Sequence, residues 1–316
     1  MVGAGNSRHG VGAQRVSPWL WFLPVILLLS VVTLYPAAVV VWLSVQKTRF
    51  YEPLGFAGLR NYTRLLISDA FWQFSLNSLL YVVGTLAAVL PTGLGLALLL
   101  QALGSARNVV RTILLLPWTL SMAVLGSFWI WLLNPSYGPI SYWLQRLGVS
   151  PGLMLGDPQL ALPLLIVVTA WWTFPYVMVM MSAALQGIPR ELYEAVNIDG
   201  AGRLAAFRYV TWPFVAPTLG STALILSILY LTLVTLIIVL TGGGPLGSTT
   251  TWSFEIFRAG FQSVDLSPAS ALSIVVLIVN LGLDAEIRIG EATVRFVTME
   301  DLPPLLSRLR DESVEK

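Results

Sequence analysis

The chain has 316 residues, of which 56% are hydrophobic and only 11% are charged, and its mean hydropathy is +0.77. Soluble globular domains carry roughly 25% charged residues, so this composition predicts an integral membrane protein with the lipid bilayer as its surroundings. The formal net charge of +2 is too small to indicate nucleic-acid binding. The absence of cysteine excludes disulfides and thiolate metal sites.

Residues 1–17 are small, polar and mildly basic, and we expect a cytoplasmic tail there. The apolar run that follows extends from Pro18 to about Val45. It is too long for the hydrophobic region of a cleaved signal peptide, which covers roughly 7 to 15 residues. It therefore predicts a retained first membrane helix, and Arg8 and Arg15 in front of it favour a cytoplasmic start.

A helix needs about 20 apolar residues to cross a bilayer. The candidate spans are residues 18–46, 72–101, 110–133, 160–186, 214–241 and 268–283. They contain no Asp, Glu or Lys, and their one Arg is Arg111, in the first turn of the third. Since backbone polar groups in hydrocarbon must bond within the segment, the sequence predicts an all-α membrane protein with six transmembrane helices. Gly93 and Gly95 are expected to let the second helix pack closely against a neighbour.

The distribution of positive charge predicts that both termini are cytoplasmic. With the N-terminus inside, the inner segments carry 12 Lys and Arg residues and the outer segments carry 6. Without the charged tail from Asp284 the counts are 7 and 6, so this preference depends on the tail.

The last apolar run is short, at about 16 residues. Either the bilayer thins around it, or charged residues complete its inner end. We expect residues 284–316 to be an atypical, charged, partly strand-like tail that is a solvated extension with no separate activity; the alternative is a small regulatory appendage.

A polar, charged loop, residues 187–213, separates the fourth and fifth predicted spans. Pro189 followed by Arg190 and Glu191 favours a helix start, because proline is tolerated in the first turn and an acid is stabilised near the positive end of the helix. The glycines that follow are expected to end or bend this helix. Pro213 and Pro217 are expected to restart the chain into the fifth span. The loop therefore predicts a short helix that lies across one membrane face and docks on another protein.

This loop resembles the EAA signature of ABC-importer permeases, which reads Glu-Ala-Ala, three residues, Gly, nine residues and Ile-x-Leu-Pro. The signature falls on Glu194–Val196, Gly200 and Val210–Pro213, with apolar replacements at Val196, Val210 and Trp212. The sugar-permease branch extends it with Asp-Gly-Ala and a later Phe. The resemblance implies a cytoplasmic coupling helix seated in a groove of an ATPase subunit. It assigns ATPase coupling to Glu194, Ala195, Asp199, Gly200, Ala201, Arg203, Phe207 and Pro213.

Shorter segments resemble the maltose, trehalose and glycerol-phosphate permeases of the same branch. They are Phe56–Tyr62, Phe71–Trp72, Asn77–Ser78, Asn134–Gly138 and Gly243–Pro245. The agreement runs from about residue 18 to residue 282, and the tail beyond Asp284 departs from the family's usual end. The resemblance implies a type I ABC-importer permease fold, with residues 18–283 as the permease domain in a bacterial or archaeal inner membrane.

The resemblance also implies the partners: a second permease subunit, two ATPase subunits, an extracytoplasmic binding protein and a carbohydrate substrate. The chain has no G-x-x-x-x-G-K-[ST] phosphate-binding loop. We therefore expect it to bind no ATP, Mg²⁺ or other cofactor, and to be a non-catalytic subunit. ATP and its Mg²⁺ are expected in the ATPase partners.

Aromatic and hydroxyl side chains in the fourth and fifth predicted spans are the candidates for substrate contact, because aromatic faces stack on sugar rings and hydroxyls bond to sugar hydroxyls. The maltose permeases take their sugar contacts from the corresponding stretches. The candidates are Trp172, Thr173, Tyr176, Ser227 and Tyr230. The alternative is that these side chains only pack helices or anchor them at the membrane interface.

Two other functional classes are weighed against an importer subunit. An ion-coupled secondary transporter usually carries ionisable residues inside the membrane as relays or ion ligands, and the predicted spans lack such residues in their interiors. A membrane enzyme would need catalytic or metal-ligating groups near one face. The one histidine, His9, lies in the N-terminal tail, so we predict no catalytic residue and no metal site.

Overall fold

The protein is described by a computed structural model that covers residues 19–148, 154–198, 200 and 202–294. Its α-helices are α1 (Trp19–Leu29), α2 (Tyr35–Ser44), α3 (Arg60–Ile67), α4 (Asp69–Ala102), α5 (Arg107–Thr119), α6 (Met122–Leu132), α7 (Pro139–Arg146), α8 (Ala161–Gln186), α9 (Arg190–Ile198), α10 (Arg203–Ala206), α11 (Trp212–Thr232), α12 (Thr235–Leu240), α13 (Trp252–Phe257) and α14 (Leu266–Val294). Shorter elements are the π turns η1 (Ser30–Leu34), η4 (Phe207–Thr211) and η5 (Arg258–Gln262), the 3₁₀ turns η2 (Gly104–Ala106) and η3 (Met154–Gly156), and the antiparallel strands β1 (Gln46–Arg49) and β2 (Glu52–Phe56).

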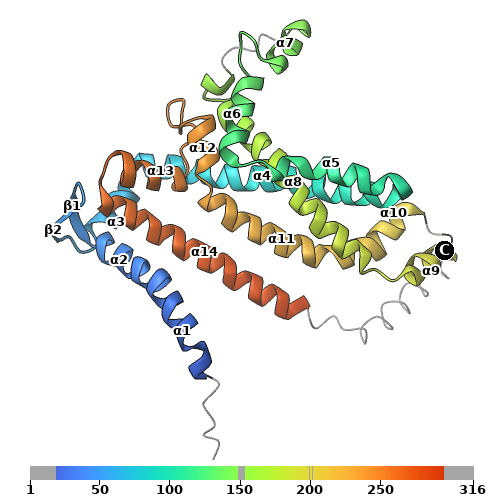
Figure 1. The fold of residues 1–316 in the computed structure, drawn as a ribbon, viewed down its shortest axis with the longest axis horizontal. Coiled ribbons are helices and arrows are strands. Elements are labelled where there is room, and N and C mark those ends of the chain that lie inside the picture. The colour runs from blue at the N-terminus through green and yellow to red at the C-terminus, as the bar shows by residue number, and fades with distance from the viewer. Residues whose placement is uncertain (1–18, 149–153, 199, 201, 295–316) are drawn as a thin grey trace, which may run out of the picture.

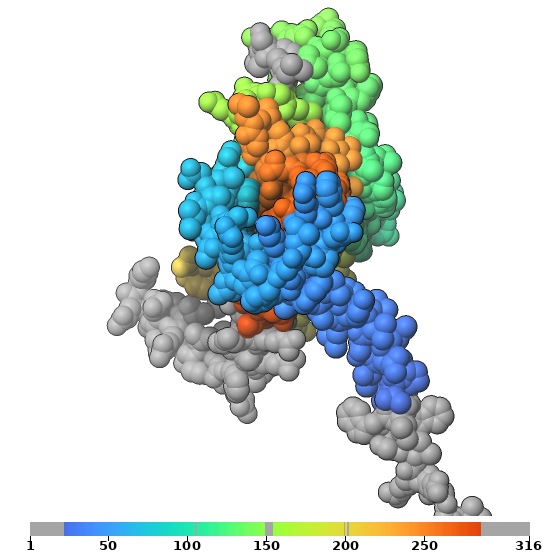
Figure 2. All heavy atoms as spheres, turned by 90° about the vertical axis from the view of Figure 1, so that its left-hand side faces the viewer, coloured from blue at the N-terminus to red at the C-terminus, as the bar shows by residue number. Residues whose placement is uncertain are grey.

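The long helices α4, α8, α11 and α14 form a bundle, with α5 alongside (Figure 1). The β1–β2 hairpin, α3 and α13 lie at one end, called here the hairpin end, and α9 and α10 lie at the opposite end, called the α9 end. Helices α6, α7 and α12 project to one side of the bundle. Figure 2 views the molecule from the hairpin end and shows α1 leaving the bundle on its own. The architecture is therefore all-α, as predicted, apart from the small hairpin.

Within the described residues, five helices are long and apolar enough to cross a membrane, and a bent pair, α5 with α6, makes a sixth if it is counted as one span. The predicted first span is confirmed as a helix from Phe22 to Ser44. This helix contains the π turn η1. In its second half, α2, Ser44 is the one buried side chain. The second and fourth predicted spans are confirmed as α4 and α8.

The third predicted span, residues 110–133, is wrong as a single straight helix. Its two halves, α5 and α6, meet at an angle of 97°. Leu120 and Ser121 between them are extended, with ψ of 137° and 146°, so the helical hydrogen-bond ladder stops there. Side chains replace the lost bonds: the Ser121 hydroxyl accepts from the Val124 N–H at 3.4 Å, and the Trp172 indole N–H donates to the Leu120 carbonyl at 3.3 Å.

The fifth predicted span, residues 214–241, is wrong at its N-terminal end. The helix begins at Arg203 and continues through α10, η4 and α11 to Thr232. Pro213 and Pro217 lie within this helix rather than before it. Because proline has no N–H to donate to the carbonyl four residues earlier, the turn in front of Pro213 widens into the π turn η4 and the helix carries on.

The C-terminal end of the fifth predicted span is also interrupted. Helix α11 stops at Thr232, Leu233 is extended with φ −69° and ψ 113°, and α12 resumes at Thr235. The Ser253 hydroxyl donates to the Leu233 carbonyl at 2.8 Å, which satisfies an acceptor that the break leaves without a helical partner. The sequence prediction of one continuous helix to residue 241 misses this break.

The sixth span is the N-terminal part of α14, which continues as a helix from Leu266 to Val294. The structure agrees with the second of the two expectations for this short apolar run: charged residues beyond Asp284 extend the helix. The expected strand-like character is wrong for residues 284–294, because Ala, Glu and Arg in this stretch favour continuation of a formed helix. Residues 295–316 lie outside the described residues, and the boundary at residue 284 stays a prediction.

Close packing between α4 and α8 holds the centre of the bundle. A Cβ atom added to Gly93 would lie 2.5 Å from Cβ of Val177, so the two helices meet there without space for a methyl group. A Cβ on Gly95 would meet nothing within 4 Å. The close approach predicted for both glycines is therefore confirmed for Gly93 and wrong for Gly95.

The loop between α12 and α13 is fixed to the hairpin end of α4 by hydrogen bonds. The Asn77 amide donates to the Gly247 carbonyl at 2.9 Å and to the Thr250 carbonyl at 3.0 Å. The Trp252 N–H donates to the Ser78 hydroxyl at 2.8 Å. Nearby, Glu255 pairs with Arg258 on η5, and this hydrogen bonding raises the pKa of Arg258.

Candidate functional site

Helix α9 lies at the end of the bundle and follows α8 after only Gly187–Pro189. Ile188 is 6% exposed and belongs to the core, so this short connection is held against the bundle. The predicted helix start is confirmed, with Pro189 before the helix and Glu191 in its first turn. Because so few residues join them, α8 and α9 must move together.

The inner face of α9 packs against the bundle. Leu192, Tyr193 and Val196 are partly buried against the main core cluster, a spacing that places them on one face of a helix. The Tyr193 and Thr211 hydroxyls are 3.0 Å apart and hydrogen-bonded. Thr211 is 4% exposed and lies at the end of η4. Helix α9 is therefore seated by an apolar face and by one polar link to the helix that follows.

The outer face of α9 is exposed and combines charge with apolar side chains. Glu194 and Ala195 lie on this face. Ile198 and Leu204 are 85% and 80% exposed, and Arg203 is exposed beside Leu204. Exposed aliphatic side chains rimmed by polar groups are typical of protein contact sites. We call the exposed side chains Glu194, Ala195, Ile198, Arg203 and Leu204 the α9 surface.

The glycine of the predicted signature has a clear backbone role. Gly200 has φ of +70°, a conformation that costs glycine little and other residues more. A Cβ there would meet nothing within 4 Å, so the constraint comes from the backbone rather than from crowding. Asp199 and Ala201, the other coupling candidates in this turn, lie outside the described residues.

The remaining coupling candidates belong to the fifth helix rather than to a loop. Phe207 is the first residue of η4, is half-buried, and lies with its ring centroid 6.3 Å from that of Trp212. Pro213 is at the second position of α11 and exposed. Residues 203–213 therefore connect the α9 surface to the membrane helix without a flexible segment.

The substrate candidates Thr173 and Tyr230 are brought together, but inside the bundle. Their hydroxyl oxygens are 2.7 Å apart, and each side chain is 1% exposed. One turn earlier on α8, the Thr169 hydroxyl lies 2.9 Å from the Tyr81 hydroxyl of α4. These two pairs join α4, α8 and α11 in one buried hydroxyl network, whose members Tyr81 and Thr169 the sequence analysis missed. Hydroxyls at helical spacing were the signal that could have found Thr169.

The other candidates differ in accessibility. Trp172 donates its indole N–H to the Leu120 carbonyl at the break between α5 and α6. The Ser227 hydroxyl donates to the Ala223 carbonyl of its own helix at 2.8 Å. Tyr176 is partly exposed, and its ring lies 5.7 Å from that of Trp118, which is 44% exposed. Among the substrate candidates, Tyr176 therefore forms an aromatic pair with an exposed partner ring.

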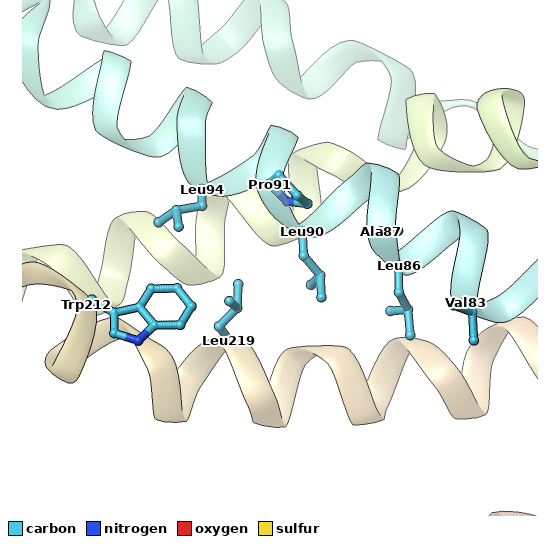
Figure 3. Close-up of a pocket in the computed structure, with 8 residues that line it drawn as sticks. All are labelled: Val83, Leu86, Ala87, Leu90, Pro91, Leu94, Trp212 and Leu219. Carbon is cyan, nitrogen blue, oxygen red and sulfur yellow. The ribbon is translucent and has the colours of Figure 1, made fainter. Parts of the chain in front are cut away.

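An apolar groove of about 490 Å³ runs between α4 and α11 near the α9 end (Figure 3). Its lining residues are Val83, Leu86, Ala87, Leu90, Pro91, Leu94, Trp212 and Leu219. Such a lining offers no hydrogen-bonding group to a polar ligand apart from the Trp212 indole. Within the part of the chain that the structure describes, no group of three His, Cys, Asp or Glu side chains could hold a metal ion.

Residues 89–295 match the protein family described as binding-protein-dependent transport system inner membrane component. The chain is 35% identical over 266 residues to the trehalose/maltose transport system permease protein of Thermococcus litoralis, covering 83% of this chain and 89% of that relative. It is 32% identical to the sulfoquinovosyl glycerol transport system permease protein of Agrobacterium fabrum, covering 86% of this chain and 89% of the relative. It is also 32% identical to the sn-glycerol-3-phosphate transport system permease protein of Yersinia enterocolitica, covering 92% and 99%.

A solved structure shares the fold. One chain of a bacterial ABC transporter involved in the import of the acidic polysaccharide alginate superposes with a TM-score of 0.76 at 23% identity, over 89% of this chain and 95% of that chain. This confirms the type I permease fold expected from the sequence. The family match covers α9 and both helices that flank it. The chain is therefore a multi-pass membrane protein of the binding-protein-dependent transport system inner membrane component family, a permease subunit of the ABC-importer type.

Proposed function

We propose that this permease forms half of the translocation pathway of an ATP-driven carbohydrate importer, in which the α9 surface docks on a cytoplasmic ATPase subunit. The complete assembly contains a second permease, two ATPase subunits and an extracytoplasmic binding protein. The observation that carries the proposal is the construction of α9, whose inner face is fixed to the bundle and whose outer face exposes Ile198 at 85%. In this proposal ATP and Mg²⁺ bind to the ATPase subunits, and this chain binds neither.

The proposed docking sets the orientation of the chain. The α9 end faces the cytoplasm, and the hairpin end faces the binding protein. Both chain termini are then cytoplasmic. The first helix begins away from the hairpin end of the bundle, and α14 also ends away from it. Closure of the ATPase dimer would displace α9 and, with it, α8 and α11. The ion-coupled alternative receives no support from the family or from the solved relatives.

Carbohydrate is the proposed substrate class because the relatives named above are described for trehalose and maltose, a sulfoquinovosyl glycerol and sn-glycerol-3-phosphate. All are rich in hydroxyl groups. Tyr176 is the best supported contact, since its ring is accessible beside Trp118. Thr173 and Tyr230 could bond a substrate hydroxyl only after their mutual hydrogen bond opens, and we place them in the pathway in that second conformation.

The proposal is tested by reconstituting the chain with its partners in proteoliposomes and measuring ATP-dependent uptake of labelled maltose, trehalose and sn-glycerol-3-phosphate. Glu194→Lys and Gly200→Asp should abolish uptake while the chain still inserts in the membrane. Gly148→Asp is the matched control, because Gly148 also has a positive φ, of +78°, with open space around it, but lies far from α9 in the sequence. Normal uptake by both variants of the α9 end would contradict the coupling assignment.

A further inference from the structure

Helix α9 has two flanking helices, and it is connected to them differently. Only Gly187–Pro189 separate it from α8, so the chain itself transmits any movement to α8. Toward α11, the chain passes through a turn around Gly200 and then through α10 and η4. A direct connection between α9 and the base of α11 would carry a movement of α9 to α11 past this turn.

We propose that the hydrogen bond between the Tyr193 and Thr211 hydroxyls is this connection, and that both are positioning residues which transmit α9 movement to α11. The inference rests on the proposed function, because it requires an ATPase that moves α9. Within residues 190–198 and 203–232, this is the one side-chain hydrogen bond that joins α9 to the fifth helix. We call this pair the hydroxyl clasp.

The clasp is protected from water on the α11 side. Thr211 is 4% exposed, and Tyr193 is partly buried against the core cluster. The Thr211 hydroxyl also lies 3.5 Å from the Ala206 carbonyl, five residues earlier. In a buried position, a hydrogen bond competes little with water and holds its geometry. The clasp can therefore stay formed when α9 moves, whereas water would replace an exposed hydrogen bond.

The clasp contacts the fifth helix at an irregular turn, where its hydrogen-bond pattern departs from that of a regular α-helix. Thr211 ends the π turn η4, immediately before Trp212 and Pro213. Pro213 has no backbone N–H to donate to this turn, and π turns inside helices are frequently found at functional sites. A pull on Thr211 would therefore act at a local irregularity, while the regular helix beyond it moves as a unit.

Farther along the bundle, a second pair of hydroxyl groups joins α8 to α11, so the two helices move together. Thr173 on α8 and Tyr230 on α11 are hydrogen-bonded at 2.7 Å. Helices α8 and α11 are thus joined at two depths: through α9 and the clasp at one end, and through Thr173 and Tyr230 inside the membrane. Loss of the clasp leaves the second junction intact, and α9 then remains connected to α11 through the Gly200 turn and α10.

The test uses the assembled transporter in proteoliposomes and measures the number of ATP molecules hydrolysed per labelled maltose or trehalose molecule imported. Tyr193→Phe and Thr211→Val each remove one hydroxyl and keep the packing. We expect each to raise this ratio about fivefold, the factor that corresponds to one hydrogen bond. The double variant should be no worse than either single variant, because both act on one bond. Thr211→Ser should restore the wild-type ratio.

Matched controls separate the clasp from a general loss of hydroxyl groups. Thr222 is buried on the same helix, and its hydroxyl bonds only the Thr218 carbonyl, so Thr222→Val should leave the ratio unchanged. Tyr209→Phe removes a phenol from η4 that is 55% exposed and should also be silent. Wild-type ratios in both clasp variants, or additive effects in the double variant, would overturn the proposal.

A second measurement needs no ATPase. The chain contains no cysteine, so spin labels can be attached at Asn197→Cys and Ile225→Cys alone. The distance distribution between α9 and α11 should broaden in Tyr193→Phe and stay narrow in Tyr209→Phe; equal widths would contradict the clasp. Failure of the proposed function looks different, since the wild-type assembly would then show no ATP-dependent uptake, or Glu194→Lys would transport normally.

Discussion

Replacing Gly93 by alanine tests whether the contact between α4 and α8 sets the stability of the bundle. The added Cβ would lie 2.5 Å from Cβ and Cγ1 of Val177 and 3.0 Å from the backbone nitrogen of Met178. Ordinary carbon contacts lie at about 3.5–4.0 Å, so the helices must separate by about 1 Å. Overpacking of this kind costs about 1–3 kcal/mol, against a gain of up to about 1 kcal/mol from the better helix propensity of alanine.

The assay compares Gly93→Ala with Gly95→Ala in the purified protein. A Cβ on Gly95 would meet nothing within 4 Å, so this variant keeps the gain in propensity without the clash. Because unfolding of such proteins is often irreversible, the apparent thermal midpoints are compared at one fixed scan rate. We expect Gly93→Ala to unfold at least about 2 °C below Gly95→Ala. Equal midpoints, or a higher midpoint for Gly93→Ala, would refute the packing argument.

Two further predictions concern side chains that complete the backbone hydrogen bonds of interrupted segments. Trp172→Phe removes the donor to the Leu120 carbonyl, and we expect the free energy of unfolding to fall by about 1 kcal/mol because a partly buried acceptor loses its hydrogen bond; the thermal midpoint measures it. Asn77→Ala removes both donors to the loop carbonyls of Gly247 and Thr250, and hydrogen exchange of residues 246–251 should become faster by at least about fivefold.

Each of these variants has a control on the same helix. Trp171 packs edge-on against Trp129 with ring centroids 5.6 Å apart and makes no hydrogen bond to the broken segment, so Trp171→Phe should not affect the Leu120 carbonyl. If it destabilises the protein as much as Trp172→Phe does, loss of aromatic volume explains both. Thr92→Val on α4 removes an exposed hydroxyl that bonds its own helix, and it should leave loop exchange unchanged.

Hydropathy predicted where the chain crosses the membrane but not where its helices break. Spans such as residues 72–101 and 160–186 are continuous helices, and apolar length alone identifies them. The break at Leu120 leaves hydropathy high on both sides, so a window average passes through it. Ser121 was a usable signal, since serine caps helix N-termini, and here its hydroxyl accepts from the Val124 N–H.

The break after Thr232 had no such local signal. Its freed carbonyl, at Leu233, is satisfied by Ser253, twenty residues later in the chain, so only the tertiary structure explains it. Pro213 gave the opposite error: it looked like a boundary, yet the helix absorbs it by widening one turn. Proline therefore marks a defect in the hydrogen-bond ladder, and the surroundings decide whether that defect ends the helix.

Some features of the site could be predicted from the sequence and others could not. The position of α9 follows from Glu194 and Gly200, because a fixed spacing and a glycine that adopts a positive φ can be read directly. The state of the substrate candidates could not be read in this way. Thr173 and Tyr230 lie 57 positions apart, and only the packing of α8 against α11 shows that each satisfies the other.

The 97° bend between α5 and α6 also has a consequence for how the chain enters the bilayer. Helix α6 has 11 residues and α12 has 6, so at 1.5 Å per residue neither reaches across a hydrocarbon core of about 30 Å. The insertion machinery meets α5 with α6 as one apolar stretch before α8, whose Trp172 bonds the carbonyl at the bend, has entered the membrane. The third span is therefore expected to insert as a straight helix and to bend only after α8 has followed it into the membrane, which makes biogenesis sequential.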